Sequence, residues 1–225
     1  MKSILAAALA IGTLGANMGV AFAADLAEEA PVMTAPSVTS ASYYVGGNFG
    51  YGTGFADHHG SPPGFPKGDD LNLAGWLLGG QVGATFKLSD NIVGGVQADL
   101  DWSNISGSGI FGGNGTITET INWTGTVEGR LGLETGGLMP YLAGGLAFAN
   151  ATRTWTGFGG GSANVTHMGW SLGAGVVVQV ADNTNLDFEY RYQSFGAMTY
   201  PNGTPNSPSV SLTTNQVRVG LNWSF

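Results

Sequence analysis

The sequence is poor in charge, contains no cysteine and has no long apolar run beyond its first residues. Only 10% of its 225 residues are charged, whereas soluble domains average about 25%, and this excludes an ordinary water-facing surface. Without cysteine, an exported fold must hold together without disulfides. After residue 23 no stretch supplies the roughly 20 consecutive apolar residues of a transmembrane helix. A helical membrane protein is therefore excluded.

Glycine and aromatic residues take the place of the missing charge. The chain has 39 glycines, 6 tryptophans, 7 tyrosines and 11 phenylalanines. The glycines show no period of three, which excludes collagen, and so many large side chains exclude a disordered chain. A net charge of −8 leaves no basic stripe for phosphate, so we expect no nucleic-acid partner.

The first 41 residues precede the region of regular patterning. Lys2, an apolar stretch over residues 4–14 and the small residues around Ala23 predict a secretory signal peptide that is cleaved after Ala23. Pro31 and Pro36 break the segment that follows. The predicted segments are a signal peptide (1–23), a flexible periplasmic leader (24–41) and a β-barrel (42–225).

Beyond residue 41 the apolar residues recur with a period of two, which indicates β-strands. Leu186, Phe188, Tyr190 and Tyr192 share one face of such a run, and polar residues occupy the other. This alternation predicts eight strands, at about 42–53, 71–88, 92–104, 118–134, 140–154, 166–180, 185–195 and 212–225. Each run is long enough to cross a bilayer as a tilted strand, which needs about 9–11 residues.

The connections between these runs alternate in length. Short turns are predicted at 89–91, near 136–137 and at 182–184, and long loops at 54–70, 105–117, 155–165 and 196–211. This pattern predicts an all-β fold: an eight-stranded antiparallel up-and-down transmembrane β-barrel with short periplasmic turns and four long extracellular loops. Closure into a barrel satisfies every backbone polar group, as lipid requires.

The two faces of the strands differ in chemistry. Between residues 121 and 133 the outward set is Ile121, Trp123, Val127, Leu131 and Leu133, and the inward set is Asn122, Thr124, Thr126, Glu128 and Arg130. Aromatic residues near the run ends predict two interfacial girdles, formed by Tyr43, Trp76, Phe86, Trp102, Trp123, Trp155, Trp170, Tyr200 and Trp223. The alternative is a secreted lipocalin-like barrel, in which the largely Gly, Ser, Thr and Asn face would have to cover the outside.

Charged residues on the inward face predict a polar core in the barrel lumen. The members of this lumen network are Lys87, Asp99, Asp101, Glu128, Arg130, Asp187, Glu189, Arg191 and Arg218. Eight strands leave a lumen just wide enough for side chains to fill, and buried charges must pair. Two interpretations follow: a plugged structural lumen, or a narrow conduit that prefers cations because five carboxylates face four bases.

Residues 43–47 (YYVGG) open the first run, residues 140–145 (PYLAGG) open the fifth, and residues 217–225 (VRVGLNWSF) form the last. With the alternation and the unequal connections, these segments resemble the small eight-stranded outer-membrane barrel family, in the style of alphaproteobacterial surface-antigen, porin-like proteins related to OmpA-type and opacity-type barrels. The resemblance covers about residues 42–225 and implies a place in the outer membrane of a Gram-negative bacterium. It also implies that the barrel-assembly machinery reads the last strand, with Trp223 and Phe225 as the assembly signal.

Other motifs point only weakly to chemistry. Residues 107–112 spell G-x-G-x-x-G, but no helix can begin after them to hold a pyrophosphate. Residues 169–173 spell G-x-S-x-G inside an alternating run, where the strained strand-to-helix turn of a nucleophile elbow does not fit. In the first long loop, His58 and His59, near Asp57, Asp69 and Asp70, could bind haem or a metal ion, although solvated histidines are the simpler interpretation.

We therefore expect an integral outer-membrane barrel, without enzymatic activity or cofactor, that serves envelope integrity and surface presentation. The expected partners are outer-membrane lipid, lipopolysaccharide and the barrel-assembly machinery, and the expected state is a monomer. The alternatives are a narrow porin-like channel for small solutes, and a haem-binding or lipid-modifying barrel.

Overall fold

The computed structural model describes residues 41–59, 71–111, 115–156, 160–200 and 209–225. They form eight antiparallel strands: β1 (Ala41–His59), β2 (Leu71–Lys87), β3 (Ile92–Phe111), β4 (Gly115–Leu133), β5 (Leu138–Trp155), β6 (Gly161–Ala181), β7 (Thr184–Thr199) and β8 (Ser209–Ser224). The described ranges contain no helix that is long and apolar enough to span a bilayer.

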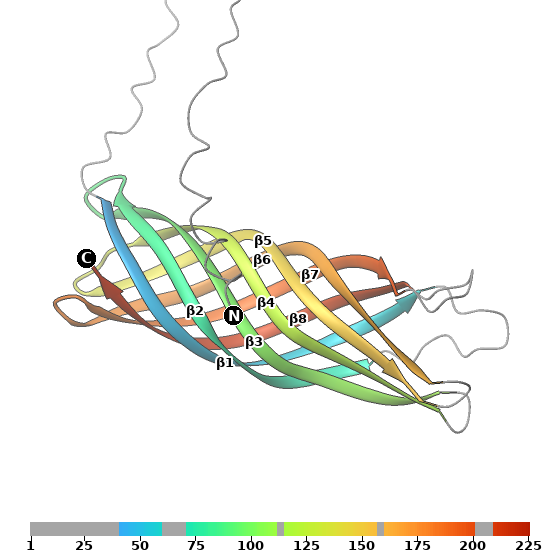
Figure 1. The fold of residues 1–225 in the computed structure, drawn as a ribbon. Helices are drawn as coiled ribbons and strands as arrows, with labels where there is room; N and C mark the ends of the chain where they lie inside the picture. Colours follow the sequence, from blue (N-terminus) through green and yellow to red (C-terminus); the bar gives the residue numbers. More distant parts are fainter. Residues whose placement is uncertain (1–40, 60–70, 112–114, 157–159, 201–208) are drawn as a thin grey trace, which may run out of the picture. The chain divides into compact units, whose positions relative to one another are not determined.

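Each strand pairs with the next along the chain, and β8 pairs with β1, so the sheet closes into a barrel (Figure 1). The short connections β2–β3, β4–β5 and β6–β7 lie at the end of the barrel where Phe225 pairs with Tyr43. Gly136 and Gly137 have positive φ angles of 56° and 90°, the backbone that a tight hairpin turn between β4 and β5 requires. The predicted fold class and strand order are therefore confirmed.

The strands extend further than predicted at the opposite end. β1 continues to His59, where a loop was predicted from residue 54, and β3 continues to Phe111 rather than ending at 104. The backbones of His58 and His59 pair with Val210 and Ser209 of β8. Their side chains, and residues 60–70 with Asp69 and Asp70, lie outside the described part of the chain. The haem or metal hypothesis therefore stays a prediction.

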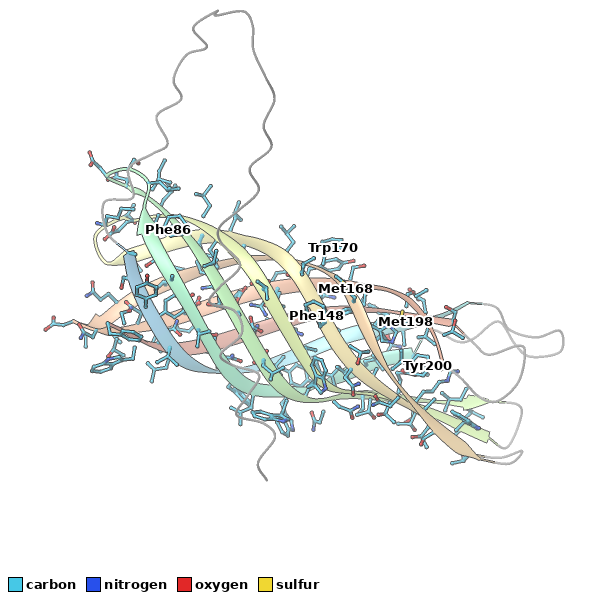
Figure 2. The ribbon with its side chains drawn as sticks, turned by 45° about the horizontal axis from the view of Figure 1, so that its top comes forward. Phe86, Phe148, Met168, Trp170, Met198 and Tyr200 are labelled. Carbon is cyan, nitrogen blue, oxygen red and sulfur yellow. The ribbon has the colours of Figure 1, made fainter. Side chains whose placement is uncertain are left out.

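Large apolar side chains cover the outside of the barrel (Figure 2). Leu100, Leu142 and Leu172 expose 52%, 66% and 57% of their surface. The residues that precede them on their strands, Asp99, Tyr141 and Ser171, are buried. Because a Lys or Arg side chain at the bilayer midplane costs about 2–4 kcal/mol, the scarcity of charge follows from this face. The lipocalin-like alternative, with its polar face outward, is wrong.

Glycine occupies inward-facing positions where there is no room for a side chain, as the comparison of Gly144 and Gly145 on β5 shows. A Cβ atom at Gly145, which faces inward, would lie 2.0 Å from the backbone oxygen of Val127. A Cβ atom at Gly144, which faces outward, would meet nothing closer than the backbone oxygen of Ser171 at 3.5 Å. Close approach of strands inside a narrow barrel therefore requires Gly145, whereas Gly144 has room for a side chain.

A β-bulge reverses the predicted alternation in β4. The register shifts between Ile121 and Trp123 against β5, and between Trp102 and Ile105 against β3. Asn122 and Trp123 consequently both face outward, and Ile121 faces inward with 0% exposure. The predictions of Ile121 as outward and Asn122 as inward are therefore wrong, because a bulge inserts one residue and breaks the period of two.

Candidate functional site

Arg191 on β7 lies at the centre of a charged network that crosses the lumen. Its guanidinium nitrogens lie 3.0 Å from Asp99 of β3, 2.9 Å from Glu128 of β4 and 3.2 Å from Glu189 of β7. The Arg191 side chain is 0% exposed. In the order of strands around the barrel, β7 lies opposite β3. The ion pair between Arg191 and Asp99 therefore joins opposite walls of the barrel.

Two further arginines extend this network. Arg218 of β8 pairs with Asp99 at 3.1 Å and with Asp101 at 3.0 Å. Arg130 of β4 pairs with Asp187 at 2.7 Å and with Glu189 at 3.3 Å. Hydroxyl groups complete the contacts: Thr126 donates to Asp99, and Tyr141 donates to Asp187.

The structure brings together eight of the nine residues predicted for the lumen network. The buried members are Asp99, Asp101, Glu128, Arg130, Asp187, Glu189, Arg191 and Arg218. Five carboxylates here face three guanidinium groups, so hydroxyl donors supply hydrogen bonds that cations do not. Each arginine holds at least two carboxylates, which is the pairing that buried charges require.

Lys87, the ninth predicted residue, does not belong to the buried network. It is the last residue of β2, its side chain is 50% exposed, and it pairs with Glu134 at 2.9 Å. The prediction was wrong because a lysine at a strand end can extend its strongly hydrated ammonium into water. Lys87 and Glu134 instead line a cavity of about 300 Å3 at the periplasmic end, together with Tyr44, Arg130 and Tyr141.

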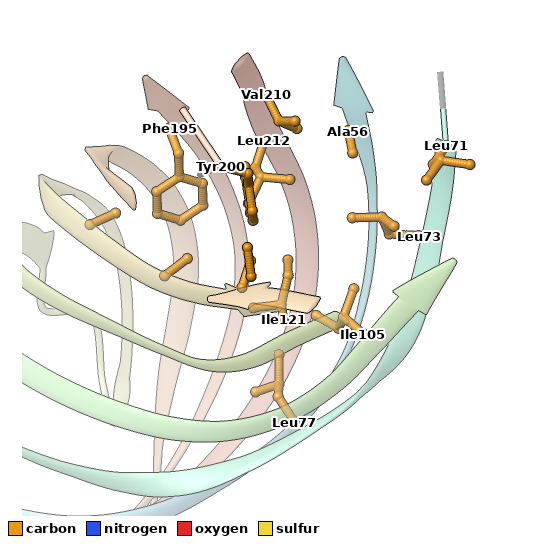
Figure 3. Close-up of a cluster of buried hydrophobic side chains, with 14 residues drawn as sticks. Ala56, Leu71, Leu73, Leu77, Ile105, Ile121, Phe195, Tyr200, Val210 and Leu212 are labelled. Carbon is orange, nitrogen blue, oxygen red and sulfur yellow. The ribbon is translucent and has the colours of Figure 1, made fainter. Parts of the chain in front are cut away.

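Apolar side chains fill the lumen towards the extracellular end, which the sequence did not predict (Figure 3). Leu77, Ile105 and Ile121 are each 0% exposed. The full apolar cluster consists of Ala56, Leu71, Leu73, Leu77, Ile105, Ile121, Ala147, Ala149, Ala151, Ala163, Phe195, Tyr200, Val210 and Leu212. The interior thus has two layers, one charged and one apolar, and both are packed.

A second polar group lies within the apolar layer and was also missed. The hydroxyl of Tyr200 lies 2.6 Å from Glu119 of β4 and 2.9 Å from Nε2 of His167 on β6. Arg153 of β5 is the direct cross-strand neighbour of Glu119. Alternation along β4 and β5 could have predicted that Glu119 and Arg153 face inward. The bulge in β4 breaks this alternation, and both residues lie near or beyond the predicted ends of their strands.

Aromatic side chains border the outward apolar face. Trp102, Trp170 and Trp223 are 67%, 50% and 56% exposed, as predicted for girdle positions. Tyr200 is only 1% exposed, and Trp155 packs against the apolar cluster, so the prediction of these two as girdle residues is wrong. Both lie near the extracellular end, where an aromatic residue can turn into the lumen instead of meeting lipid.

The last strand ends beside the first. Phe225 donates a backbone hydrogen bond to Tyr43 at 2.9 Å, and the two rings stack with centroids 6.4 Å apart. Phe225 nevertheless exposes 74% of its surface. The two residues predicted as the assembly signal, Trp223 and Phe225, therefore stand on the outside of the barrel at its periplasmic end.

On the extracellular side of Trp170, the outer face of β4, β5 and β6 changes from apolar to uncharged polar residues. Asn150 and Asn164 exchange two amide hydrogen bonds of 2.7 and 2.9 Å, and Asn122 donates to Asn150 at 2.9 Å. We call this surface the Asn/Thr face; it consists of Thr118, Thr120, Asn122, Asn150, Thr152, Thr154, Ser162, Asn164 and Thr166. Phe148, Met168 and Trp170 lie just below it on β5 and β6 (Figure 2).

The sequence motifs of enzymes lie within strands. Ser171, the central residue of the G-x-S-x-G match, is 3% exposed in the middle of β6. Gly107 and Gly109 of the G-x-G-x-x-G match belong to β3 and pair with β4. Neither position has the turn geometry that a nucleophile elbow or a dinucleotide loop needs.

Comparisons with known proteins agree with this architecture. Residues 12–225 match the family described as "Outer membrane protein beta-barrel domain". The 31 kDa outer-membrane immunogenic protein of Brucella melitensis is 31% identical over 253 residues, covering 100% of both chains. The 25 kDa outer-membrane immunogenic protein of Brucella abortus is 30% identical over 232 residues, covering 100% of this chain and 99% of the relative.

Among solved structures, Neisserial surface protein A is similar, with a TM-score of 0.47 and 17% identity over 83% of this chain and 99% of that one. The family match covers nearly the whole chain, and the Brucella relatives are aligned over all of it. The chain therefore belongs to the outer membrane protein beta-barrel domain family and resides in the outer membrane of a Gram-negative bacterium.

Proposed function

We propose that this protein is a non-catalytic, non-conducting barrel that reinforces the outer membrane and presents its extracellular loops as surface antigen. The packed lumen is the observation that carries this proposal. The immunogenic character named for the Brucella relatives supports the antigen role.

The packing of the lumen argues against a conduit in two ways. A hydrated ion would have to displace the Arg191 contacts to Asp99 and Glu128, which are 0% exposed. It would then meet the apolar side chains of Leu77 and Ile121, which cannot replace its hydration shell. Both layers would have to rearrange before a small solute could pass.

We expect the purified barrel to give no steady single-channel current in planar bilayers. A general diffusion porin, added to the same bilayers, provides the positive control. Protein recovered from vesicles of the same lipid should show heat-modifiable electrophoretic mobility, which demonstrates that a protein without channel current has nevertheless inserted and folded. Reproducible current steps, especially with a preference for cations, would instead support the narrow porin-like alternative.

We also propose that the Asn/Thr face contacts the sugars of lipopolysaccharide in the outer leaflet. Amide and hydroxyl groups without formal charge suit neutral sugar hydroxyls, whereas a phosphate-binding face would present Lys or Arg. This face begins on the extracellular side of Met168 and Trp170, which are 56% and 50% exposed, and its position supports the proposal because aromatic residues mark the edge of the lipid layer.

The double variant Asn150→Leu/Asn164→Leu is expected to retain less lipopolysaccharide per barrel after detergent exchange. Each lost hydrogen bond of about 1 kcal/mol corresponds to about a fivefold loss of affinity. Asn215→Leu, on the outer face of β8, is the matched control and should retain the wild-type amount. Truncated lipopolysaccharide without core sugars should abolish the difference. An equal loss in the control, or an equal difference with truncated lipid, would refute the proposal.

Assembly and oligomeric state complete the proposed function. We propose that the barrel acts as a monomer, since its closed sheet leaves no strand edge to pair with another copy. The exposed Trp223 and Phe225 at the periplasmic end are accessible to the barrel-assembly machinery, in keeping with a role as its recognition signal.

A further inference from the structure

Three buried side chains form a hydrogen-bonded chain near the extracellular end of the barrel. The Tyr200 hydroxyl bridges Glu119 Oε1, at 2.6 Å, and His167 Nε2, at 2.9 Å. The other ring nitrogen of His167, Nδ1, lies 3.2 Å from the backbone oxygen of Gly196 on β7. Glu119 and His167 are 0% exposed and Tyr200 is 1% exposed.

These contacts require one more hydrogen than the ordinary charge states provide. The Gly196 oxygen can only accept, so Nδ1 must carry a hydrogen. In a neutral ring Nε2 then carries none and must accept the hydrogen of Tyr200. Tyr200 has no second hydrogen to donate to Glu119, whose ionised carboxylate can only accept. All three contacts therefore form together only when Glu119 and His167 jointly hold one additional proton.

Two arrangements can hold this proton. In the first, His167 is an imidazolium that donates to Tyr200 and Gly196, and Tyr200 donates to the Glu119 carboxylate. In the second, Glu119 is a carboxylic acid, and reversal of the Tyr200 hydroxyl makes it donate to neutral His167. Burial disfavours both the imidazolium of the first arrangement and its carboxylate, whereas Arg153, the cationic cross-strand neighbour of Glu119 on β5, stabilises the carboxylate. The three contacts form in either arrangement, because each holds the same additional proton.

Loss of the proton removes one contact. The hydrogen bond between Tyr200 and the ionised Glu119 is charge-assisted and short, so it is retained. A neutral His167 has one hydrogen for two acceptors, and we expect it on Nε2, because the Tyr200 oxygen lies closer, at 2.9 Å, than the Gly196 oxygen does to Nδ1, at 3.2 Å. Burial raises the pKa of the Tyr200 hydroxyl, so this bridging group stays protonated throughout the physiological range. The contact to Gly196 is the one that opens.

The contact between His167 and Gly196 lies at an irregular stretch of β7. Pairing between β6 and β7 stops at Gly169 and Phe195, and the β7–β8 register shifts between Phe195 and Met198. Gly196 and Ala197 therefore lie outside both ladders, whereas Met198 and Thr199 pair again with β8. His167 contacts the Gly196 oxygen and the Tyr200 hydroxyl, and so holds this stretch against β6. Around these groups β7 and β8 contribute the apolar Phe195, Val210 and Leu212.

We propose that Glu119, Tyr200 and His167 form a proton-operated latch, in which uptake of one proton fastens the segment Gly196–Tyr200, at the end of β7, to β6 and loss of that proton releases it. The latch lies at the end of the barrel that faces the surroundings of the cell. It therefore couples external acidity to the order of the segment that enters the β7–β8 connection.

Nitrogen-15 NMR of His167 in nanodiscs tests the latch between pH 5 and 9, with His58→Gln and His59→Gln leaving His167 as the sole histidine. Nδ1 should carry a hydrogen at low pH, together with Nε2 if the proton resides on His167 and alone if it resides on Glu119, and only Nε2 should carry one at high pH. Over the same transition the exchange protection of the Ala197–Thr199 amides, corrected for intrinsic rates, should fall about tenfold, as the loss of one hydrogen bond allows. A ring whose nitrogens carry the same hydrogens at pH 5 and at pH 9 would overturn the proposal.

Glu119→Gln provides the decisive variant. Its amide group donates to Tyr200, which frees the Tyr200 hydrogen for neutral His167 and satisfies all three contacts without the extra proton. We expect protection at Ala197–Thr199 to become high and independent of pH. Met168→Leu, beside His167 on the outer face of β6, should keep the wild-type pH dependence. A folded Glu119→Gln barrel whose protection at Ala197–Thr199 still depends on pH as in wild type would overturn the latch. If that variant does not assemble, the nitrogen-15 titration of His167 in the Glu119-containing barrel tests the proposal by itself.

Discussion

Replacement of Arg191 with methionine is expected to destabilise the barrel more than any other single substitution in its interior. Arg191 holds Asp99, Glu128 and Glu189, and its side chain is 0% exposed. Methionine fills most of the volume but leaves these carboxylates facing one another without a cation. Removal of one member of a buried ionic network costs about 3–5 kcal/mol. Urea unfolding of the barrel in lipid vesicles, followed by tryptophan fluorescence, measures the change in free energy.

Lys87→Met is the matched control, because it removes a cation from an ion pair that is 50% and 44% exposed. Surface pairs contribute about 0–1 kcal/mol, so this control should unfold almost as wild type does. Adding Asp99→Asn and Glu128→Gln to Arg191→Met should restore part of the lost stability, since the repelling charges disappear. Equal effects of Arg191→Met and Lys87→Met would show that the network does not stabilise the fold.

The sequence was sufficient for the barrel but not for the length of its strands. Alternation between lipid-facing and inward residues identified β7 and β8 clearly, because lipid imposes apolar residues on one face. Beyond the bilayer this constraint ends, and segments such as Gly107–Phe111 resemble loops in composition. Their backbone still pairs with β4, since hydrogen bonding between strands does not depend on apolar side chains.

A period of two predicts which face of a strand a residue occupies, but not which residues on different strands contact one another inside the barrel. It placed Arg130 and Asp187 on the inward face, but not their pairing across strands that are far apart in the chain. It could not place Ile121, because a bulge changes parity without a distinct residue type. Tyr200 and His167, 33 residues apart, meet only because β6 and β7 lie side by side, and neither residue alone indicates a polar group inside an apolar layer.

Deletion of Phe225 is expected to reduce the amount of folded barrel in the outer membrane by about tenfold or more, which corresponds to at least about 1.4 kcal/mol in an assembly equilibrium or barrier. The folded state itself loses little. Phe225 is 74% exposed, and its contacts are two backbone hydrogen bonds with Tyr43 and a ring contact at 6.4 Å. A large loss in cells must therefore arise while the barrel is assembled. Heat-modifiable mobility of the outer-membrane fraction measures it.

Refolding of the purified chain into detergent separates recognition from stability. If Phe225 acts as a signal, the deletion should refold in detergent with an unfolding free energy within about 1 kcal/mol of wild type, the scale of one or two exposed contacts. Tyr43→Ala removes the ring partner but keeps the terminal residue, so it should assemble normally in cells. If the deletion variant refolds as poorly in detergent as it assembles in cells, Phe225 is needed for the stability of the barrel and not for recognition. The same conclusion follows if Tyr43→Ala assembles as poorly in cells as the deletion does. If the deletion refolds in detergent and Tyr43→Ala assembles in cells, Phe225 acts through the assembly machinery, because a residue that contributes little to the folded barrel can be required only by what recognises it during assembly.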